Sequence, residues 1–162
     1  MKKLVSLLLI FVLLASFVSC MGVSPKEFSC EGMTITLTDD FSEKSYEGYT
    51  TCYSSDDVAV FILKESFSLA PGVSELTLDQ YAQAVYEANS SKSPDPIKKE
   101  SGLTIMEHSF FNEEEEKTYG YCSVMFKGED AFWLIQFACY EDDYDEKKPQ
   151  FIDWAKSVTF DS

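Results

Sequence analysis

Residues 117–139 contain two long apolar runs on either side of Lys127-Gly128-Glu129-Asp130, which is the pattern of a β-hairpin. Successive strand residues point to opposite faces, so a strand with one wet face alternates apolar with polar residues. Neither run alternates in this way, which predicts a hairpin in the middle of a sheet with both faces covered. A turn centred on Glu129 would place on one face Tyr119, Tyr121, Ser123, Met125, Trp133, Ile135, Phe137 and Cys139, and on the other Gly120, Cys122, Val124, Phe126, Phe132, Leu134, Gln136 and Ala138.

Four further strands are predicted outside the hairpin. Residues 33–38 alternate Met, Ile and Leu with threonine, so this strand has one apolar face. Residues 49–54 and 58–63 follow as the second and third strands, and the third is apolar throughout, as expected of a strand buried on both faces. Residues 103–111 form the fourth strand, shortly before the hairpin.

Two helices are predicted to cover the sheet. Thr77 and Gln80 have the spacing of a capping box, and an apolar stripe follows them at helical spacing. A second stripe begins at Phe151, and Pro149 with the carboxylates before it places the start of that helix near Lys148. The order of these elements and their short connections predict one α+β domain, with an antiparallel β-sheet of about six strands sandwiched between helices.

The N-terminus has the pattern of a targeting segment. Lys2 and Lys3 precede a mostly apolar segment over 4–18, which as a helix would reach only ~22 Å against the ~30 Å hydrocarbon core of a membrane. A small residue then precedes Cys20, and this pattern resembles the signal of bacterial lipoproteins, in which the cysteine at this position is lipidated. We therefore predict a signal peptide over 1–19, a lipidated Cys20 with a short tether over 20–27, and a single domain over 28–162. A plain secretory signal is the alternative.

Charge limits the partners of this chain. Its formal net charge of −15 becomes −17 once Lys2 and Lys3 leave with the signal peptide, and it contains no arginine. Recognition of nucleic acid or phosphate uses basic patches and the forked donors of arginine, so this composition argues against both. It also argues against a domain that lies flat on an anionic membrane surface.

Four segments carry recognisable motifs, which are GMTITL at 32–37, VAVFILKE at 58–65, AFWLIQFAC at 131–139 and FIDWAKSV at 151–158. Over residues 28–160 the chain resembles the small bacterial lipoproteins of the PsbP-like fold, in which an antiparallel sheet lies between helices. The resemblance implies the fold, and it brings no catalytic or cofactor-binding residues with it. Function inferred from a fold is a weak argument, so the chemistry must be sought in individual residues.

His108 is the one histidine of the chain, so an enzyme with a Ser-His-Asp or Cys-His arrangement would have to use it. A simple hairpin before residue 117 would pair His108 with Tyr119, and the turn centred on Glu129 would pair Tyr119 with Cys139. His108 and Cys139 would then share a face at ~9.6 Å, two strand spacings apart, whereas a nucleophile and its base need ~3 Å. We therefore predict a packed histidine, bonded to a tyrosine or the backbone, and no enzyme.

Two further clusters have both a functional and a structural interpretation. The aromatic row over the hairpin could be a ligand platform, but strand-interior aromatic residues beneath a helix are expected to be core. The acidic cluster before the last helix could bind Ca²⁺, but it lacks the glycine and the bidentate glutamate of a calcium loop, so a solvated helix start is favoured. The residues are Tyr119, Tyr121, Trp133 and Phe137 in the row, and Asp142, Asp143 and Asp145 in the cluster.

Four cysteines besides Cys20 allow three complete disulfide pairings. The register above places Cys122 and Cys139 on opposite faces, so these two cannot bond. Cys30–Cys52 is the best candidate among the remaining pairs, and it would contribute ~3 kcal/mol by closing its loop. Reduced, buried thiols are the alternative.

These features together predict a non-catalytic lipoprotein without cofactors, held on the extracytoplasmic face of the cell membrane by the lipid on Cys20. Its expected role is to bind or support a protein partner at the cell surface. The alternative is a binder of a small extracytoplasmic ligand or Ca²⁺.

Overall fold

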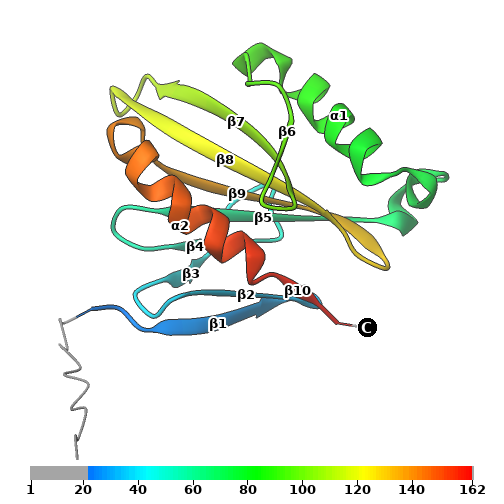
Figure 1. Ribbon diagram of the computed structural model, residues 1–162, viewed down its shortest axis with the longest axis horizontal. Helices are drawn as coiled ribbons and strands as arrows, with labels where there is room; N and C mark the ends of the chain where they lie inside the picture. Colours follow the sequence, from blue (N-terminus) through cyan, green and yellow to red (C-terminus); the bar gives the residue numbers. More distant parts are fainter. Residues whose placement is uncertain (1–21, 162) are drawn as a thin grey trace, which may run out of the picture.

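The computed structural model of the protein describes residues 22–161 (Figure 1). The predicted signal peptide over 1–19 and the predicted lipidation site Cys20 lie outside these residues. The helices are α1 (Leu78–Ala88) and α2 (Tyr144–Lys156), with short 3-10 turns η1 (Phe67–Leu69), η2 (Val73–Glu75), η3 (Ser90–Lys92) and η4 (Glu141–Asp143). The strands are β1 (Pro25–Cys30), β2 (Met33–Thr38), β3 (Ser42–Lys44), β4 (Thr51–Ser54), β5 (Ala59–Ser66), β6 (Lys98–Glu100), β7 (Leu103–Asn112), β8 (Lys117–Lys127), β9 (Ala131–Tyr140) and β10 (Thr159–Phe160).

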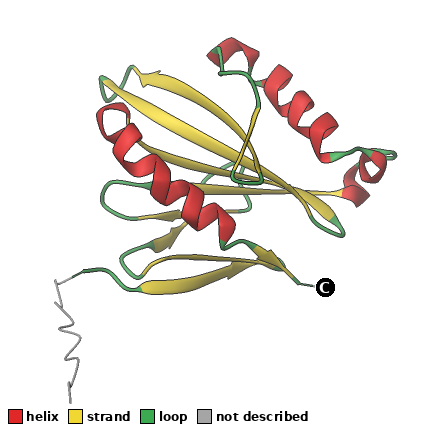
Figure 2. Cartoon of the chain, in the orientation of Figure 1, coloured by secondary structure: helices red, strands yellow, loops and turns green. Residues whose placement is uncertain are grey.

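The strands form two antiparallel sheets, which confirms the predicted α+β class (Figure 2). The large sheet has the order β3-β4-β5-β9-β8-β7-β6, and the small sheet has the order β1-β2-β10. The sequence predicted about six strands in one sheet, because β3, β6 and β10 are too short to show a periodicity. β1 begins at Pro25, so the segment 20–27 predicted as a tether includes the first half of a strand.

One face of the large sheet is covered by α2 and the small sheet, and the main core lies between them. Alternate residues of β2 are fully buried there while the threonines between them are only partly buried, as the sequence pattern predicted. Phe137 of β9 stacks on Phe151 of α2 with ring centroids 5.3 Å apart. Trp133 of β9, 1% exposed, belongs to the same core.

The predicted start of α2 near Lys148 is wrong. The helix begins at Tyr144 and contains Pro149. Asp145 and Glu146 lie in its first turn, where carboxylates favour the positive end of the helix dipole. The helix therefore includes these carboxylates and begins five residues before Pro149.

α1 lies on the opposite face of the large sheet, and its start confirms the sequence prediction. The Thr77 side chain accepts a hydrogen bond from the Gln80 N–H at 3.2 Å, and the Gln80 side chain accepts one from the Thr77 N–H at 2.8 Å. This capping box fixes the first turn of the helix. Tyr81 then stacks on Phe132 with ring centroids 4.2 Å apart, which attaches α1 to β9.

The register of the β8–β9 hairpin differs by one residue from the predicted one. Lys127 pairs with Phe132, and the Gly128 N–H donates to the Ala131 carbonyl at 2.9 Å, so the loop proper is Glu129 and Asp130 alone. A turn centred on the single residue Glu129 would have an odd number of loop residues, whereas the actual loop has two. Because side chains alternate between faces, this one-residue change transfers every β9 side chain to the opposite face relative to β8.

The hairpin between β7 and β8 differs from its prediction by two residues, which leaves the faces unchanged. Asn112 pairs with Lys117, and His108 pairs with Tyr121 instead of Tyr119. The Asn112 side-chain oxygen accepts hydrogen bonds from the N–H groups of Glu114 and Glu115, and these bonds help to close a loop of four residues, 113–116, in place of the six that the predicted pairing implies. Within residues 22–161, no helix is long and apolar enough to cross a membrane.

Candidate functional site

α1 covers only one half of its face of the large sheet. The helix has 11 residues and is therefore ~16 Å long. β8 also has 11 residues, but as a strand it extends ~36 Å. The side chains buried under α1 all come from one end of the sheet, and they are Met106, Met125, Phe132 and Leu134. The other end of this face has no helix over it (Figure 1).

A groove crosses the uncovered half of this face, and its floor is made of two alanines. Ala59 of β5 lies directly opposite Ala138 of β9, and larger side chains stand on both sides of the pair. The resulting hollow has a volume of about 340 Å³. We call it the aromatic groove; it is lined by Tyr46, Ser54, Ser55, Asp56, Asp57, Val58, Ala59, Phe61, Phe110, Asn112, Glu115, Tyr119, Tyr121, Ala138, Cys139 and Tyr140.

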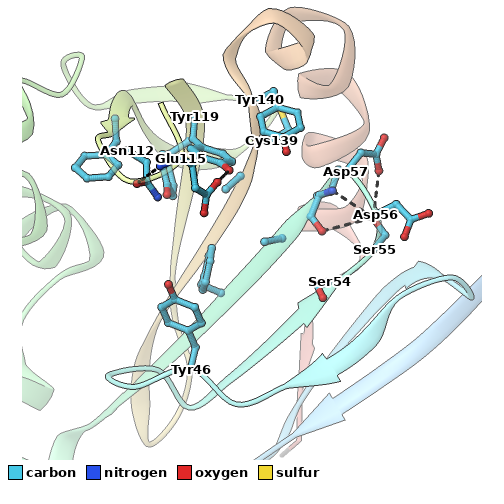
Figure 3. A pocket seen from close by; sticks show the side chains of 16 residues that line it. Tyr46, Ser54, Ser55, Asp56, Asp57, Asn112, Glu115, Tyr119, Cys139 and Tyr140 are labelled. Carbon is cyan, nitrogen blue, oxygen red and sulfur yellow. Dashed lines mark hydrogen bonds between the residues drawn. The ribbon is translucent and has the colours of Figure 1, made fainter. Parts of the chain in front are cut away.

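Aromatic rings form two walls of the groove. Tyr46 packs edge-on against Phe61 on one side, with ring centroids 5.3 Å apart. Tyr119 packs against Tyr140 on the other side at 5.2 Å. Figure 3 shows Tyr46 and the Tyr119 side chain reaching the groove from these two sides. Tyr46 is 59% exposed, so its ring is available to a ligand.

Three carboxylates belong to the groove, and they differ in their partners. Lys147 pairs with Asp57, and this hydrogen bond lowers the pKa of that carboxyl. Asp56 is exposed, and its carboxylate points away from the groove in Figure 3. Glu115 accepts a hydrogen bond from the Tyr119 phenol, which raises the pKa of Tyr119. Glu115 is therefore the carboxylate that the groove holds in a fixed position beside its rings.

A buried polar chain separates the groove from the core under α1. The Tyr49 hydroxyl donates to Gln136 at 2.8 Å, and the Gln136 amide donates to the Ser123 hydroxyl at 3.0 Å. Gln136 and Ser123 are both buried, so this chain satisfies polar groups that water cannot reach. It also fixes the position of Tyr49, whose ring packs against Phe61 with ring centroids 5.0 Å apart.

His108 lies behind the groove wall and is packed against it. Its ring stacks on Tyr121 with centroids 4.7 Å apart and 8° between the planes. The side chain is 7% exposed, and Nδ1 has no hydrogen-bond partner among the described residues. Burial, with a smaller contribution from the charge of Lys92, lowers the pKa of His108 to about 4. The imidazole is therefore neutral near pH 7.

The prediction that His108 and Cys139 share a face of the sheet is wrong. Cys139 pairs with Gly120 and belongs to the core on the α2 side, whereas His108 pairs with Tyr121 on the groove side. The cause is the one-residue register change at the β8–β9 hairpin. The two side chains lie on opposite faces of the sheet, so they do not form a nucleophile–base pair.

The same register change divides the predicted aromatic row. Trp133 and Phe137 are core residues on the α2 side, as expected. Tyr119 and Tyr121 lie on the other face and line the groove. For these two tyrosines, the expectation of a covered core position is wrong, because α1 is too short to reach them.

The cysteines of the described region are free thiols. Cys30 packs against the α2-side core, while Cys52 follows Thr51 on the opposite face of β4 from the core residue Tyr53. The predicted bond between Cys30 and Cys52 is not formed, because the large sheet lies between the two side chains. Cys122 and Cys139 share a face in the actual register, contrary to the prediction, and burial raises the pKa of Cys122 to about 12 and of Cys139 to about 11.

A calcium site finds no support in the described part of the chain. Residues 22–161 contain no group of three or more histidines, cysteines or carboxylates arranged to hold a metal ion. The acidic cluster instead surrounds the start of α2, as the structural interpretation predicted, and its members are Asp142 and Asp143 in η4 and Asp145 in the helix.

Sequence reasoning missed most of the groove. Tyr46 lies in a loop, and the apolar pattern around Ala59 and Phe61 predicts a strand buried on both faces. A signal was present in Ala59 and Ala138, since two small residues on neighbouring central strands leave space on a sheet face. Their pairing depends on the register, and this could not be read from the sequence.

No protein-family model matches the chain, and no curated protein matches it either. Among solved structures, a cyanobacterial PsbP protein from Synechocystis sp. PCC 6803 is similar with a TM-score of 0.54 and 11% identity, over 91% of this chain and 98% of that one. The chain has a PsbP-like fold. This confirms the fold that the four sequence motifs implied, over nearly the whole length of the cyanobacterial protein.

Two other solved structures are similar to this PsbP-like chain at lower scores. The protein PA94 of unknown function from Pseudomonas aeruginosa matches with a TM-score of 0.43 and 10% identity, over 80% of this chain and 92% of that one. LpqN, which is involved in cell envelope biogenesis of Mycobacterium tuberculosis, matches with a TM-score of 0.41 and 11% identity, over 87% and 91%.

Proposed function

We propose that this PsbP-like protein is a lipid-anchored, extracytoplasmic and non-catalytic domain that binds a protein partner through the aromatic groove. The observation that carries the proposal is the uncovered aromatic half of the large sheet. Tyr46, Phe110 and Phe111 are 59%, 45% and 55% exposed at or beside it. Clustered apolar side chains on a surface of this kind are typical of interaction sites.

The surroundings of His108 support a non-catalytic role. Its imidazole is neutral, stacked on Tyr121 and buried, so it is poorly placed to exchange protons with a substrate in the groove. The thiol of Cys139 faces the other side of the sheet, and burial raises its pKa to about 11, so it is protonated near pH 7. Neither group has the arrangement of an activated nucleophile and its base.

The proposed anchor at Cys20 rests on the sequence pattern, and the fold adds a geometric consequence. β1 begins at Pro25, so only four residues would separate the lipidated cysteine from the first strand. Four extended residues reach ~14 Å. A domain held this closely to a membrane would meet partners that are themselves in or beside the membrane.

A small ligand is the second candidate occupant of the groove. The volume of about 340 Å³ falls near the lower end of the range for small-molecule sites, ~300–1,000 Å³. The exposed Phe111 lies on the opposite face of β7 from the groove-lining Phe110, so the apolar surface continues around the edge of the sheet. A protein segment can cover both residues, and we therefore favour a protein.

Photo-crosslinking from membranes tests this proposal. A photoreactive phenylalanine analogue replaces Phe110 in the full-length protein, and in a matched control it replaces Leu69, which is 76% exposed and away from the groove. We expect one reproducible crosslinked protein from position 110 and none from position 69. Crosslinks of equal yield from both positions, or none from position 110, would contradict a protein-binding groove.

A further inference from the structure

The described residues that line the groove include aromatic rings and carboxylates but no basic side chain. Asp56, Asp57 and Glu115 are acidic, and of these Asp57 is already paired with Lys147. The adjoining loop over 113–116 adds three further glutamates to Glu115. A cation over the face of an aromatic ring is attracted by the ring quadrupole, and a nearby carboxylate strengthens this attraction. The chemistry of the groove therefore matches a cationic group.

The chain itself places a cation on one ring of this groove. Lys117 Nζ lies 4.3 Å from the centre of the Tyr140 ring, and it donates a hydrogen bond to the Tyr140 hydroxyl at 2.8 Å. In the described structure, the other rings of the groove have no lysine over them. Tyr46, Phe110 and Tyr119 therefore remain available to a cation from another molecule.

Glu115 is held where it can meet such a cation. The Tyr119 phenol donates to the Glu115 carboxylate, so the carboxylate is oriented beside the ring instead of moving freely with its loop (Figure 3). The loop that carries it is fixed by two hydrogen bonds from the Glu114 and Glu115 N–H groups to Asn112, at 3.0 and 3.2 Å. A prearranged carboxylate and ring lower the ordering cost of binding.

The edge of β7 explains why the cation would belong to a protein segment. β6 pairs only with residues Leu103–Ile105 of β7, and beyond it the Glu107 carbonyl accepts a bond from the Asp95 N–H at 2.8 Å. The backbone N–H and C=O groups of successive strand residues point to opposite sides in the plane of the sheet. Ser109 and Phe111 therefore direct their N–H and C=O groups to the same outer side as Glu107. These groups have no backbone partner among the described residues, and an extended chain can pair with such an edge.

We propose that the groove receives a lysine or arginine side chain of an extended segment of the partner protein, with the cation over Phe110 and Tyr119 and beside Glu115. This inference rests on the proposed function, because it identifies the part of the partner that enters the groove. The segment would pass along the free edge of β7, which is next to Phe110. The acidic net charge, −15 for the full sequence and −17 without Lys2 and Lys3, would favour the approach of a basic partner.

A peptide library tests the inference without knowledge of the partner. The full-length protein, held in nanodiscs of neutral lipid, is exposed to immobilised twelve-residue peptides with neutral flanks and one fixed central residue. The fixed residue is arginine, lysine, citrulline or norleucine. We expect arginine and lysine to bind roughly tenfold better than the two neutral residues, since cation–π and ion-pair contacts together reach this size. Equal binding of citrulline or norleucine would overturn the proposal.

Two glutamate variants separate local contact from general attraction. Glu115→Gln removes the groove carboxylate, and Glu113→Gln removes the same charge from the same loop outside the groove. We expect the preference for arginine to fall severalfold in Glu115→Gln and to persist in Glu113→Gln. Equal loss in both variants would mean that only the net charge attracts the peptide, and it would overturn the proposed site.

The outcome can also separate this inference from the proposed function. If position 110 still crosslinks the partner while Glu115→Gln binds it as well as the wild type does, the groove binds a protein and the cation assignment is wrong. If a free cation such as tetramethylammonium perturbs the fluorescence of the groove tyrosines while no peptide binds, the occupant is a small molecule. That result would overturn the assignment to a protein segment.

Discussion

Ala59 and Ala138 lie directly opposite each other on β5 and β9, and the pair forms the floor of the aromatic groove. Tyr121 pairs with Ala138 from the other side, so rings rise next to the smallest side chains of the sheet face. A sheet face without a helix over it would be flat if its residues were of similar size. The two alanines are the reason that this face is hollow, and the hollow is the basis of the proposed function.

The anchor is tested by Cys20→Ala. A serine before Cys20 at the end of a short apolar segment predicts lipidation at this residue. The variant is expected to release the mature domain or to leave an unprocessed precursor in the membrane, and labelled fatty acid should enter only the wild type. Lipidation and processing of Cys20→Ala like those of the wild type would show that the anchor is elsewhere.

The core is tested by removing one large side chain from each face of β9. Trp133 is 1% exposed on the α2 side, and Leu134 is 7% exposed under α1. We expect Trp133→Ala and Leu134→Ala each to lower the free energy of unfolding by ~2–5 kcal/mol in urea. Tyr46→Ala serves as the exposed control and should change it by less than ~0.5 kcal/mol. A loss below ~1 kcal/mol at either core position would mean that its face is not packed.

The pH dependence of stability tests the buried state of His108. Folding lowers its pKa from 6.5 to about 4, so between these values the unfolded chain binds a proton that the folded chain does not. The free energy of unfolding should therefore fall as the pH drops from 6.5 toward 4, with a slope of up to ~1.4 kcal/mol per pH unit from this residue. Well above pH 6.5, where the histidine is neutral in the unfolded chain as well, the residue contributes no slope.

The control for this effect is His108→Gln. Carboxylates also titrate in the lower part of this range, so the contribution of His108 is the difference between the two slopes measured by urea unfolding. The variant should show a flatter dependence between pH 6.5 and 5. The same slope in both proteins would mean that the imidazole can be protonated in the folded state and is not buried as described.

Much of the fold could be predicted from local patterns. The alternation in β2 and the capping box at Thr77 are interactions between near neighbours in the sequence, and both are present as predicted. The groove depends instead on pairing between strands. The predicted turn is centred on Glu129, whereas the actual one is centred between Glu129 and Asp130, so the predicted faces of β9 are reversed relative to β8. The length of α1 then decides which tyrosines it leaves uncovered. Predicting this would require the position of the helix on the sheet.

The state of the cysteines is tested by alkylation in concentrated guanidinium chloride without reductant. Cys30, Cys52, Cys122 and Cys139 are free thiols, and the large sheet separates Cys30 from Cys52. Mass spectrometry of the mature protein should therefore find all four alkylated. Recovery of a linked peptide that joins Cys30 to Cys52 would contradict the described arrangement of β1 and β4.

The most direct test of the proposed function is to fill the groove. Ala59→Leu places three more carbon atoms on its floor, and Ala84→Leu makes the same change on the exposed side of α1. The measurement is the recovery of the protein crosslinked from position 110, with thermal unfolding as a check that both variants are folded. We predict that Ala59→Leu lowers this recovery roughly tenfold or more, as a loss of ~1.4 kcal/mol of binding energy would, and that Ala84→Leu leaves it unchanged. Full recovery by a folded Ala59→Leu protein would contradict the assignment of the aromatic groove as the binding site.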